Sequence, residues 1–449
     1  MNVTMHIERQ LSEQQHVQGV ERFYQAQEFF RDIGLRELRQ KEITRLAFDY
    51  QQAFWRGLEL RDESSSSLKM LPTGLKPAEF STLTAGDEAL VIEVGGTNLR
   101  AAVVQIGEDH KPHIKEHSQG QNLYYVSVPL EKRNFTSKDD FFQTLVSPCQ
   151  QLLLDFHPKA VAIIYSFPAD AEISDGIIDV RSRQMTKGFE VPGIEGITVG
   201  AEIMNRLLVN GRITQKLPYV VLNDTPAVLL SHERARIGGV LASGFNLATL
   251  VDGQIINTES GGFDGVPETE LSIAVDYYSS NRGEQLAEKQ ISGMYLEKQM
   301  KLIILGLTHA GCLEAKAADD ITSKFISDLL RMDEKGISSL DDDFLGRIDS
   351  YDLAILQSAA ARLRKRSAQI MGTMAGTIAG MLASEAGGDE IEEFEVPVEG
   401  PVFWGIPLYR QTAERCASLV SSKNVRFVER LYAGTLGAGV AALSHLKRD

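Results

Sequence analysis

One pattern occurs twice in this chain: an apolar run, a turn of small residues and a second apolar run. The first copy spans residues 90–104, with glycines at 95–96, and the second spans 239–250, with small residues at 242–244. Short runs rich in β-branched residues around a glycine turn indicate β-hairpins. Alone, such a turn is more often structural than functional. Two of them could clamp one polyphosphate, because glycine leaves backbone amides uncovered.

The first turn carries polar groups that suit a phosphate. Thr97 and Asn98 add a hydroxyl and an amide, and Glu93 places a carboxylate beside the turn. A phosphate-bound Mg²⁺ is typically met by such a carboxylate through water. The turn is not a Walker P-loop, because no Gly-Lys-Ser/Thr follows it and no helix is predicted to begin there.

The elements after each hairpin follow the same order. The first hairpin is followed by a strand, a helix, a strand, a helix and a strand, predicted at 123–130, 136–156, 160–166, 197–210 and 219–222. The second is followed by a strand, a long helical insertion, a strand, a helix, a strand and a final helix, predicted at 254–257, 269–388, 402–405, 407–420, 425–428 and 437–449. The acidic run at 389–393 is most simply a solvated loop.

This order predicts an α/β protein built from a duplicated unit, with two lobes facing each other across a central cleft that would hold a ligand. Helical periodicity at 17–60 and a serine-rich connector at 63–67 precede the first unit. We therefore predict three parts, the last of which has a final helix that could return to the small domain: N-terminal helices packing on the large domain at 1–73, a small domain at 74–221 and a large domain at 222–449.

Composition narrows the class of function. The 449 residues carry a net charge of −15 with 24% charged residues, which argues against a nucleic acid or an anionic membrane as partner. Three widely spaced cysteines, Cys149, Cys312 and Cys416, form neither a disulfide framework nor a zinc spacing, so we expect a reducing cytoplasm. The N-terminus lacks the pattern of a secretory signal.

The most apolar helical stretch, residues 370–383, is shorter than the ~20 residues that a membrane span needs. Its glycines recur every fourth residue, at Gly372, Gly376 and Gly380. This spacing predicts close contact with another helix inside a soluble protein.

Asn223 and Asp224 follow a buried strand between the two predicted halves. In α/β sheets, ligands bind beyond the carboxyl ends of the strands, where a carboxylate can act as a general base. The alternative is that Asp224 caps a helix, because Thr225 and Pro226 follow it and proline favours the first helical turn. From these residues alone, the cap is the better interpretation.

Other polar residues stand near predicted strand ends or turns. Ser166 could simply end a strand, Thr186 and Lys187 could lie in a surface turn, and Glu288 could be an exposed helix residue. Glu259 offers a carboxylate just before a glycine-rich loop. Each is weak evidence alone, but their order along the chain is informative.

Taken in order, these motifs resemble those of the hexokinase family, within the superfamily of actin-like ATPases and sugar kinases. The likeness is nearly full length, and its segments are 67–73, 93–100, 166–168 with 186–189, 222–225, 242–246, 256–259, 285–295 and 434–439. The resemblance implies a duplicated actin-like ATPase (ribonuclease H-like) fold, with a helical N-terminal segment and a long helical insertion.

The resemblance also implies roles for individual residues. Asp224 would take the proton from the C6 hydroxyl of a hexose, and Lys187 would meet the transferring phosphoryl group. The sugar hydroxyls would be held by Ser166, Thr186, Lys187, Asn223, Asp224, Asn246, Glu259 and Glu288. The ATP side would comprise Glu93, Gly95, Gly96, Thr97, Asn98, Arg100, Ser243, Gly244, Gly434 and Gly437, with Mg²⁺ near Glu93 through water.

The chain departs from the family pattern mainly on the nucleotide side. Glu93 stands where the family usually has Asp, and Ala242 replaces a glycine of the second turn. Glu399 and Pro401 alter a usual Asp-Gly-Ser, Leu436 replaces a common glycine, and Ser260 stands where many members have Trp. The sugar side keeps its polar residues.

Three hypotheses follow. The first is an ATP- and Mg²⁺-dependent kinase of a hexose, D-glucose first. The second is a sugar-binding regulator with weak or no catalysis, and the third is a kinase with another hexose or phosphoryl donor. The expected partners are the hexose and ATP, without nucleic acid or membrane. The sequence leaves open whether the protein is a monomer or a homodimer.

Overall fold

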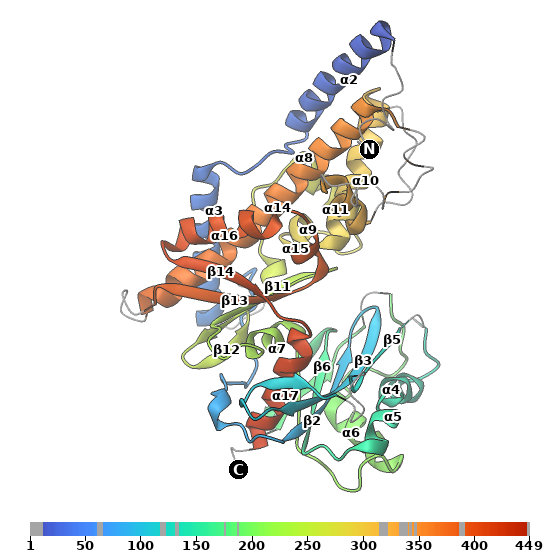
Figure 1. Cartoon of the computed structure of the whole chain (residues 1–449), viewed down its shortest axis with the longest axis vertical. Coiled ribbons are helices and arrows are strands. Elements are labelled where there is room, and N and C mark those ends of the chain that lie inside the picture. The colour runs from blue at the N-terminus through green and yellow to red at the C-terminus, as the bar shows by residue number, and fades with distance from the viewer. Residues whose placement is uncertain are drawn as a thin grey trace.

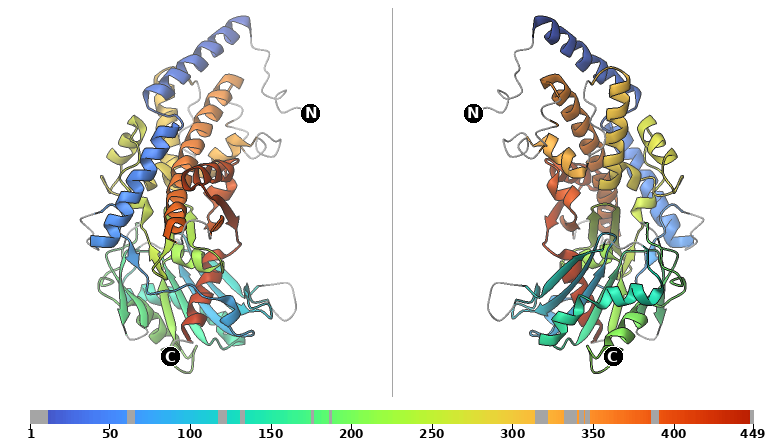
Figure 2. Two further views of the ribbon diagram at one scale, coloured as in Figure 1. Left: turned by 90° about the vertical axis from the view of Figure 1, so that its left-hand side faces the viewer. Right: turned by 90° about the vertical axis from the view of Figure 1, so that its right-hand side faces the viewer.

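The computed structural model describes residues 12–60, 66–116, 123–130, 134–174, 177–185, 188–313, 322–331, 340, 344, 348–385 and 391–446. These residues form two lobes, each built on one β-sheet (Figures 1 and 2). The lower lobe in Figure 1 contains most of the first half of the chain. The upper lobe contains the N-terminal helices and most of the second half.

The sheet of the lower lobe has the order β4-β3-β2-β6-β9-β8-β7, and β5 also pairs with β3. Its strands are β2 (Glu88–Val94), β3 (Asn98–Ile106), β4 (Pro112–Ile114), β5 (Tyr125–Pro129), β6 (Ala160–Tyr165), β7 (Ala169–Ser174), β8 (Ile177–Ser182) and β9 (Tyr219–Leu222). A hairpin joins β2 and β3, while β2, β6 and β9 are parallel. The helices of this lobe are η1 (Phe80–Thr82), α4 (Lys138–Val146), α5 (Cys149–Asp155) and α6 (Val199–Val209).

The sheet of the upper lobe has the order β1-β12-β11-β10-β13-β14. Its strands are β1 (Leu71–Pro72), β10 (Ile237–Leu241), β11 (Phe245–Val251), β12 (Gln254–Asn257), β13 (Glu393–Glu399) and β14 (Asn424–Glu429). The associated helices are α7 (Asp224–Leu230), η2 (Ser260–Gly262), α8 (Glu270–Tyr277), α9 (Glu288–Ile291), α10 (Gly293–His309), α11 (Ser323–Leu330), α14 (Ser350–Glu385), α15 (Pro401–Gly405) and α16 (Tyr409–Ser421).

The two sheets repeat one topology. In each, a hairpin is followed by a return strand parallel to its first strand: β2-β3 with β6, and β10-β11 with β13. A further parallel strand follows in both, β9 beside β6 and β14 beside β13. The duplicated α/β fold expected from the sequence is therefore confirmed.

The last helix, α17 (Ala433–His445), packs against β2, β6 and α7. Figure 1 shows it within the lower lobe, far along the chain from the strands that it covers. A Cβ added at Gly439 would lie 2.6 Å from the Val104 side chain, and one at Gly437 would lie 1.8 Å from the Ala227 carbonyl oxygen. Small residues in α17 thus let it approach the sheet and α7 closely.

The N-terminal helices α2 (Glu13–Asp32) and α3 (Gln40–Leu60) pack along α14 in the upper lobe. One face of α3 buries Leu46, Tyr50 and Phe54 in the core of this lobe. The other face of α3 is polar. Helix α3 therefore packs against the loop that follows β12, where Tyr50 contacts Phe263.

Helix α14 confirms the prediction made from its glycines. Added Cβ atoms at Gly372 and Gly376 would lie 2.3 and 2.4 Å from carbonyl oxygens of α16, and Gly380 also faces that helix. The close contact therefore depends on the missing side chains. No helix among the described residues is long and apolar enough to span a membrane.

Some predicted elements are wrong. Residues 402–405 form part of helix α15 rather than a strand, because Pro401 favours the start of a helix. The strand is β13, which begins inside the acidic run predicted as a loop. Its buried residues include Phe394, Val396 and Val398. The long helix predicted at 136–156 is broken around Pro148. The β7-β8 hairpin was not predicted.

Candidate active site

Asp224 lies where β9 passes into α7. The cap of this helix is Asn223, whose side-chain oxygen accepts a hydrogen bond from the Thr225 amide at 3.1 Å. The prediction that Asp224 itself is the cap is therefore wrong. Pro226 occupies the third helical position, because the helix begins at Asp224, one residue earlier than a cap at Asp224 would require.

Hydroxyl groups from two elements hold the Asp224 carboxylate. Ser166 Oγ donates to Asp224 Oδ2 at 3.3 Å, and Thr225 Oγ1 donates to Asp224 Oδ1 at 3.2 Å. Ser166 follows β6, which lies parallel to β9, so both residues stand at the same edge of the sheet. The carboxyl ends of parallel strands are the usual place for a ligand.

Glu259 follows β12 in the other sheet and is held by two amide side chains. Asn257 Nδ2 donates to Glu259 Oε1 at 2.8 Å, and Asn246 Nδ2 lies 3.4 Å from the same oxygen. Asn246 Nδ2 also donates to Asn257 Oδ1 at 2.6 Å. Glu259 has a φ of 56°, a left-handed conformation that costs energy for a residue with a side chain.

The Glu259 carboxylate is partly buried, and its desolvation raises its pKa above the ordinary value. The hydrogen bond from Asn257 and the positive charge of Lys69 lower that pKa, whereas the negative charge of Asp224 raises it. Asp224 and Glu259 are therefore close enough to interact although they come from different sheets.

A second group of hydrogen bonds supports the backbone beside Glu259. The Ser260 amide donates to Asn246 Oδ1 at 3.0 Å. The Ser260 hydroxyl lies 2.5 Å from Thr258 Oγ1 and 2.7 Å from the hydroxyl of Tyr50 on α3. Complete burial raises the pKa of Tyr50 to about 12, so this phenol stays neutral and keeps its proton for hydrogen bonding.

The second turn contacts Glu288, the first residue of α9. The Phe245 amide donates to Glu288 Oε2 at 3.0 Å. A Cβ added at Gly244 would lie 2.9 Å from the same oxygen, so the glycine is explained by the approach of Glu288. The Gly293 amide also donates to the Ala242 carbonyl at 2.8 Å. This turn therefore brings Glu288, a predicted sugar contact, against Gly244, which was predicted together with Ser243 to contact phosphate.

In the first turn, the Gly95 amide donates to the Asn98 carbonyl at 3.1 Å, and the Leu130 amide donates to the Thr97 carbonyl at 2.8 Å. Gly95, which is followed by Gly96, does not adopt a positive φ; an added Cβ would crowd the Asn98 carbonyl at 3.1 Å. Close packing rather than backbone freedom therefore explains this glycine.

Glu93 and Arg100 are direct partners across the first hairpin and form an ion pair. Burial raises the pKa of Glu93 to about 7, although Arg100 lowers it. The negative charges of Glu399 and Asp224 raise it further. The carboxylate predicted to face Mg²⁺ is thus already paired with a guanidinium.

Glu399 ends β13 and reaches the start of α17. Its Oε2 accepts a hydrogen bond from the Gly434 amide at 2.6 Å. Burial raises the pKa of Glu399, as does the negative charge of Asp224, while the Gly434 amide and Arg100 lower it. The amide predicted to serve the nucleotide is therefore bonded to a carboxylate of the protein.

Asp224 interacts electrostatically with three partly buried carboxylates: Glu93, Glu259 and Glu399. These come from the first hairpin, from the loop after β12 and from the end of β13. Both halves of the chain thus contribute carboxylates near Asp224.

Two predicted site residues, Thr186 and Lys187, lie outside the described residues. Gly437 is described, but it faces Ala227 in a helix contact, which explains the glycine without a ligand. Sequence reasoning did not select Asn257 or Lys69 for the site. Both could have been found from the sequence, because Asn257 lies two residues before Glu259 and Lys69 lies inside the segment 67–73.

Among the described residues, no group of three or more His, Cys, Asp or Glu side chains could hold a metal ion. The carboxylates around Asp224 come from separate elements. This donor set fits a metal held mainly by substrate phosphates, with a carboxylate such as Glu93 acting through water.

Comparisons with known proteins identify one family. Two family models, both described as Hexokinase, match residues 28–234 and 238–444. A hexokinase of Schistosoma mansoni is 25% identical over 426 residues, covering 86% of this chain and 90% of that protein. A hexokinase of Kluyveromyces lactis is 26% identical, covering 83% and 80%. The structure of the Schistosoma mansoni hexokinase complexed with glucose superposes with a TM-score of 0.75 at 21% identity, covering 95% of this chain and 99% of that one.

Proposed function

Because the chain belongs to the hexokinase family, we propose that it transfers a phosphoryl group from ATP to the C6 hydroxyl of a hexose, with D-glucose as the first candidate. The observation that carries this proposal is the position of Asp224 among carboxylates contributed by both halves of the chain. A sugar hydroxyl and a phosphate bound from opposite sides would meet at this point.

Asp224 is proposed as the general base. An alcohol is a much weaker acid than a carboxylic acid, so the proton leaves only as the new oxygen–phosphorus bond forms. The hydrogen bonds from Ser166 and Thr225 fix the orientation of the carboxylate and leave further lone pairs for the substrate.

The proposed sugar site consists of carboxylates, amides and hydroxyls that suit vicinal hydroxyl groups. Glu259 offers a charged acceptor oriented by Asn246 and Asn257. Its other members are Ser166, Thr186, Lys187, Asn223 and Glu288.

The proposed nucleotide side comprises the two turns, Arg100 and the start of α17. Mg²⁺ would neutralise phosphate charge there, near Glu93. Arg100 can bind a phosphate oxygen when it leaves Glu93, because a guanidinium accommodates either anion. Lys187 is proposed to meet the transferring group.

The test is release of ADP from ATP-Mg²⁺ with and without glucose, run beside Asp224→Ala. Glucose-dependent release that the variant loses supports the proposal. A panel with mannose, fructose and glucosamine determines the preferred sugar and addresses the alternative of another hexose. Equal release without any sugar would contradict the proposal.

A second candidate is a sugar-binding regulator with little catalysis. It is favoured by the internal pairing on the nucleotide side, where Glu399 occupies the Gly434 amide and Arg100 pairs with Glu93. It predicts measurable glucose binding without Mg²⁺-dependent ATP binding. A calorimetric titration with ATP separates the two candidates.

We propose the cytoplasm as the compartment, with the hexose and ATP as partners. The cysteines Cys149, Cys312 and Cys416 are all free and buried, which suits a reducing environment. Sedimentation of the purified protein distinguishes a monomer from a homodimer.

A further inference from the structure

The connection between β14 and α17 carries an arginine that contacts the last turn of α7. Arg430 is partly buried, and its guanidinium donates one hydrogen bond to the Ser231 carbonyl and another to the Pro112 carbonyl at 3.3 Å. Ser231 is the C-terminal cap of α7, and Pro112 is the first residue of β4 in the lower lobe. One side chain therefore joins three separate elements of the fold.

Helix α7 is important for the candidate active site because Asp224 is its first residue, at the end opposite Ser231. The helix is only about 10 Å long, at about 1.5 Å per residue. All of its residues from Thr225 to Leu230 are buried. A contact that holds the last turn of so short a helix also fixes where its first residue lies.

Close packing leaves α7 little freedom to move sideways. A Cβ added at Gly437 of α17 would lie 1.8 Å from the Ala227 carbonyl oxygen, and one added at Gly238 of β10 would lie 2.7 Å from Leu229. Helices α7 and α17 also pack against each other (Figure 1). This packing opposes displacement along the helix axis least, and Arg430 opposes that displacement because it binds the end of the helix.

The carboxylate of Asp224 is sensitive to such a displacement. Ser166 Oγ donates to it at 3.3 Å, which is longer than most hydrogen bonds between two oxygens. Ser166 follows β6, whereas Asp224 belongs to α7, so this distance depends on where α7 lies relative to the sheet. Thr225 belongs to the helix and would keep its hydrogen bond to the carboxylate.

The charge of Arg430 suits the end of a helix. The carbonyl groups of the last turn carry partial negative charge and attract a cation. Burial lowers the pKa of Arg430, although the negative charge of Asp109 raises it. An arginine stays protonated in proteins even so. A neutral side chain of similar length would lose the attraction to α7, whereas a lysine would keep it.

A neighbouring contact at the same junction involves Glu233, two residues after Ser231. Glu233 is exposed, and its Oε1 accepts a hydrogen bond from the Phe80 amide of η1 at 2.9 Å. This bond joins the segment after α7 to the lower lobe but does not involve the helix itself. Its loss would weaken the junction without releasing α7.

We propose that Arg430 is a positioning residue: by holding the last turn of α7, it keeps Asp224 within reach of Ser166 and so supports turnover. This role rests on the proposed function, because it takes Asp224 as the general base. It predicts a loss of turnover without a loss of affinity for the hexose or for ATP.

The kinetic test uses the full chain with ATP-Mg²⁺ and glucose. Arg430→Gln removes the cation and should lower kcat at least fivefold, while the KM for ATP and the glucose dissociation constant stay within twofold. Arg430→Lys keeps a cation that can donate to the Ser231 carbonyl, so its kcat should stay within twofold of the wild-type value. Unchanged kcat in Arg430→Gln would overturn the proposal.

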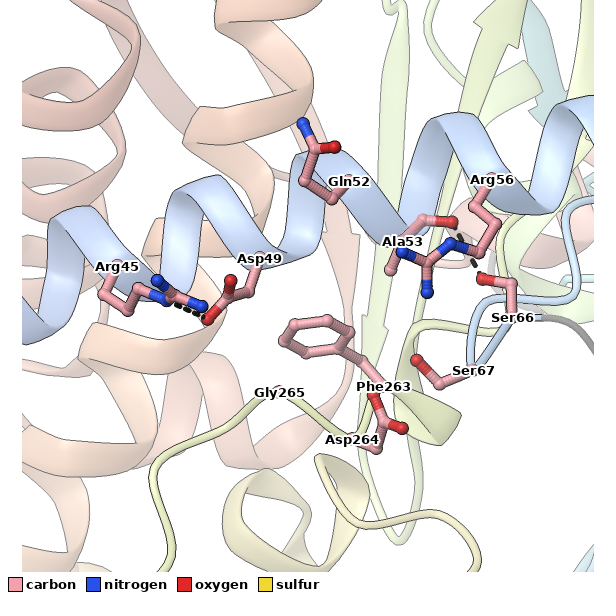
Figure 3. Close-up of a pocket in the computed structure, with 10 residues that line it drawn as sticks. All are labelled: Arg45, Asp49, Gln52, Ala53, Arg56, Ser66, Ser67, Phe263, Asp264 and Gly265. Atoms are coloured by element: carbon pink, nitrogen blue, oxygen red, sulfur yellow. Dashed lines mark hydrogen bonds and ion pairs between the residues drawn. The ribbon is translucent and has the colours of Figure 1, made fainter.

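Two control variants separate positioning from a general loss of stability. Glu233→Ala removes the neighbouring hydrogen bond, and Arg56→Gln removes an exposed arginine of α3 that lines a separate pocket of about 340 Å³ (Figure 3). Both should leave kcat within twofold of the wild-type value. A loss of kcat in Glu233→Ala as large as that in Arg430→Gln would overturn the specific role of Arg430.

Hydrogen exchange of the α7 amides is a measure that needs no turnover. Exchange at residues 227–232 should be at least threefold faster in Arg430→Gln than in wild type, and should change less than twofold in Arg430→Lys and in both controls. Unchanged exchange in Arg430→Gln would overturn the proposal even in a protein without kinase activity. Absence of turnover in the wild type would instead refute the proposed function.

If Arg430→Gln does not fold, Arg430→Lys decides the matter. Exchange of the α7 amides and kcat should then both stay within twofold of the wild-type values, or both change together. Faster exchange with unchanged kcat would overturn the proposal, because turnover would not depend on how firmly α7 is held.

Discussion

The proposed sugar side and the proposed nucleotide side of this protein hold their carboxylates in different ways. Glu259 is oriented by the amides of Asn246 and Asn257, which donate hydrogen bonds without cancelling its charge. Glu93 is paired with Arg100, and Glu399 accepts from the Gly434 amide within the field of the same arginine. Glu259 can therefore accept hydrogen bonds from hydroxyl groups, whereas the charge of Glu93 is already neutralised by Arg100.

A phosphate bound at Arg100 would therefore require the proposed nucleotide side to rearrange, because Arg100 cannot pair fully with both Glu93 and a ligand. The sugar side needs no such exchange. Its neutral donors remain in place while Glu259 accepts from a hydroxyl. We therefore expect substitutions on the two sides to separate cleanly into effects on hexose and on ATP.

The largest expected effect is at the point where the two sides meet. Asp224→Asn keeps the size of the side chain but removes the base, so turnover should fall about 10²–10⁴-fold. The glucose dissociation constant should change less than about threefold, because the neighbouring hydroxyls remain. Steady-state ADP release and calorimetry measure the two quantities, and a variant that retains turnover would remove Asp224 as the base.

On the sugar side, Glu259→Gln should raise the KM for glucose about 10–100-fold. A hydrogen bond to a charged group contributes about 1.5–3 kcal/mol, and 1.4 kcal/mol corresponds to tenfold in affinity. The KM for ATP should stay within twofold. Glu270→Gln, at an exposed position of α8, is the matched control. Equal increases in both KM values would show that the two sides are not separable.

On the proposed nucleotide side, the ionisation of Glu93 should appear in the pH dependence of kcat/KM for ATP-Mg²⁺. Its pKa of about 7 lies above the ordinary value, so the carboxylate is neutralised as pH falls through 7. At saturating glucose, kcat/KM for ATP-Mg²⁺ should fall about tenfold from pH 8 to pH 6, because roughly a tenth of the carboxylate is ionised one unit below its pKa. This step should be absent in Glu93→Gln. A flat pH profile in the wild type would show that the ionisation of Glu93 does not affect the use of ATP-Mg²⁺.

The smallest expected effect concerns the support behind Glu259. Tyr50→Phe removes the hydroxyl that lies 2.7 Å from Ser260 Oγ but keeps the ring contact with Phe263. A buried hydrogen bond contributes about 1 kcal/mol, so the free energy of unfolding should fall by about that amount. The KM for glucose should rise about two- to threefold. Chemical denaturation and kinetics measure the two changes, and Tyr24→Phe, on an exposed side chain of α2, should change neither.

Several features of the fold followed from local patterns. The glycine spacing of α14 predicted its close contact with α16, because a missing side chain every fourth residue clears one helix face. The two hairpins and the buried strands β6 and β9 were predicted from another local pattern, because their apolar runs are too short for helices. The failures had two causes: α15 is a short apolar run that begins as a helix at Pro401, and the strands of the β7-β8 hairpin have mixed polarity.

The sequence by itself determined the duplicated order of elements, the family and most residues of the candidate site, because periodicity, turn composition and motif order are local properties of the chain. Only the tertiary structure decided what each polar group does. It made Asn223 the cap of the helix that begins at Asp224, paired Glu93 with Arg100, and explained Gly244 by Glu288. These roles depend on distances between residues far apart along the chain, which no local pattern encodes.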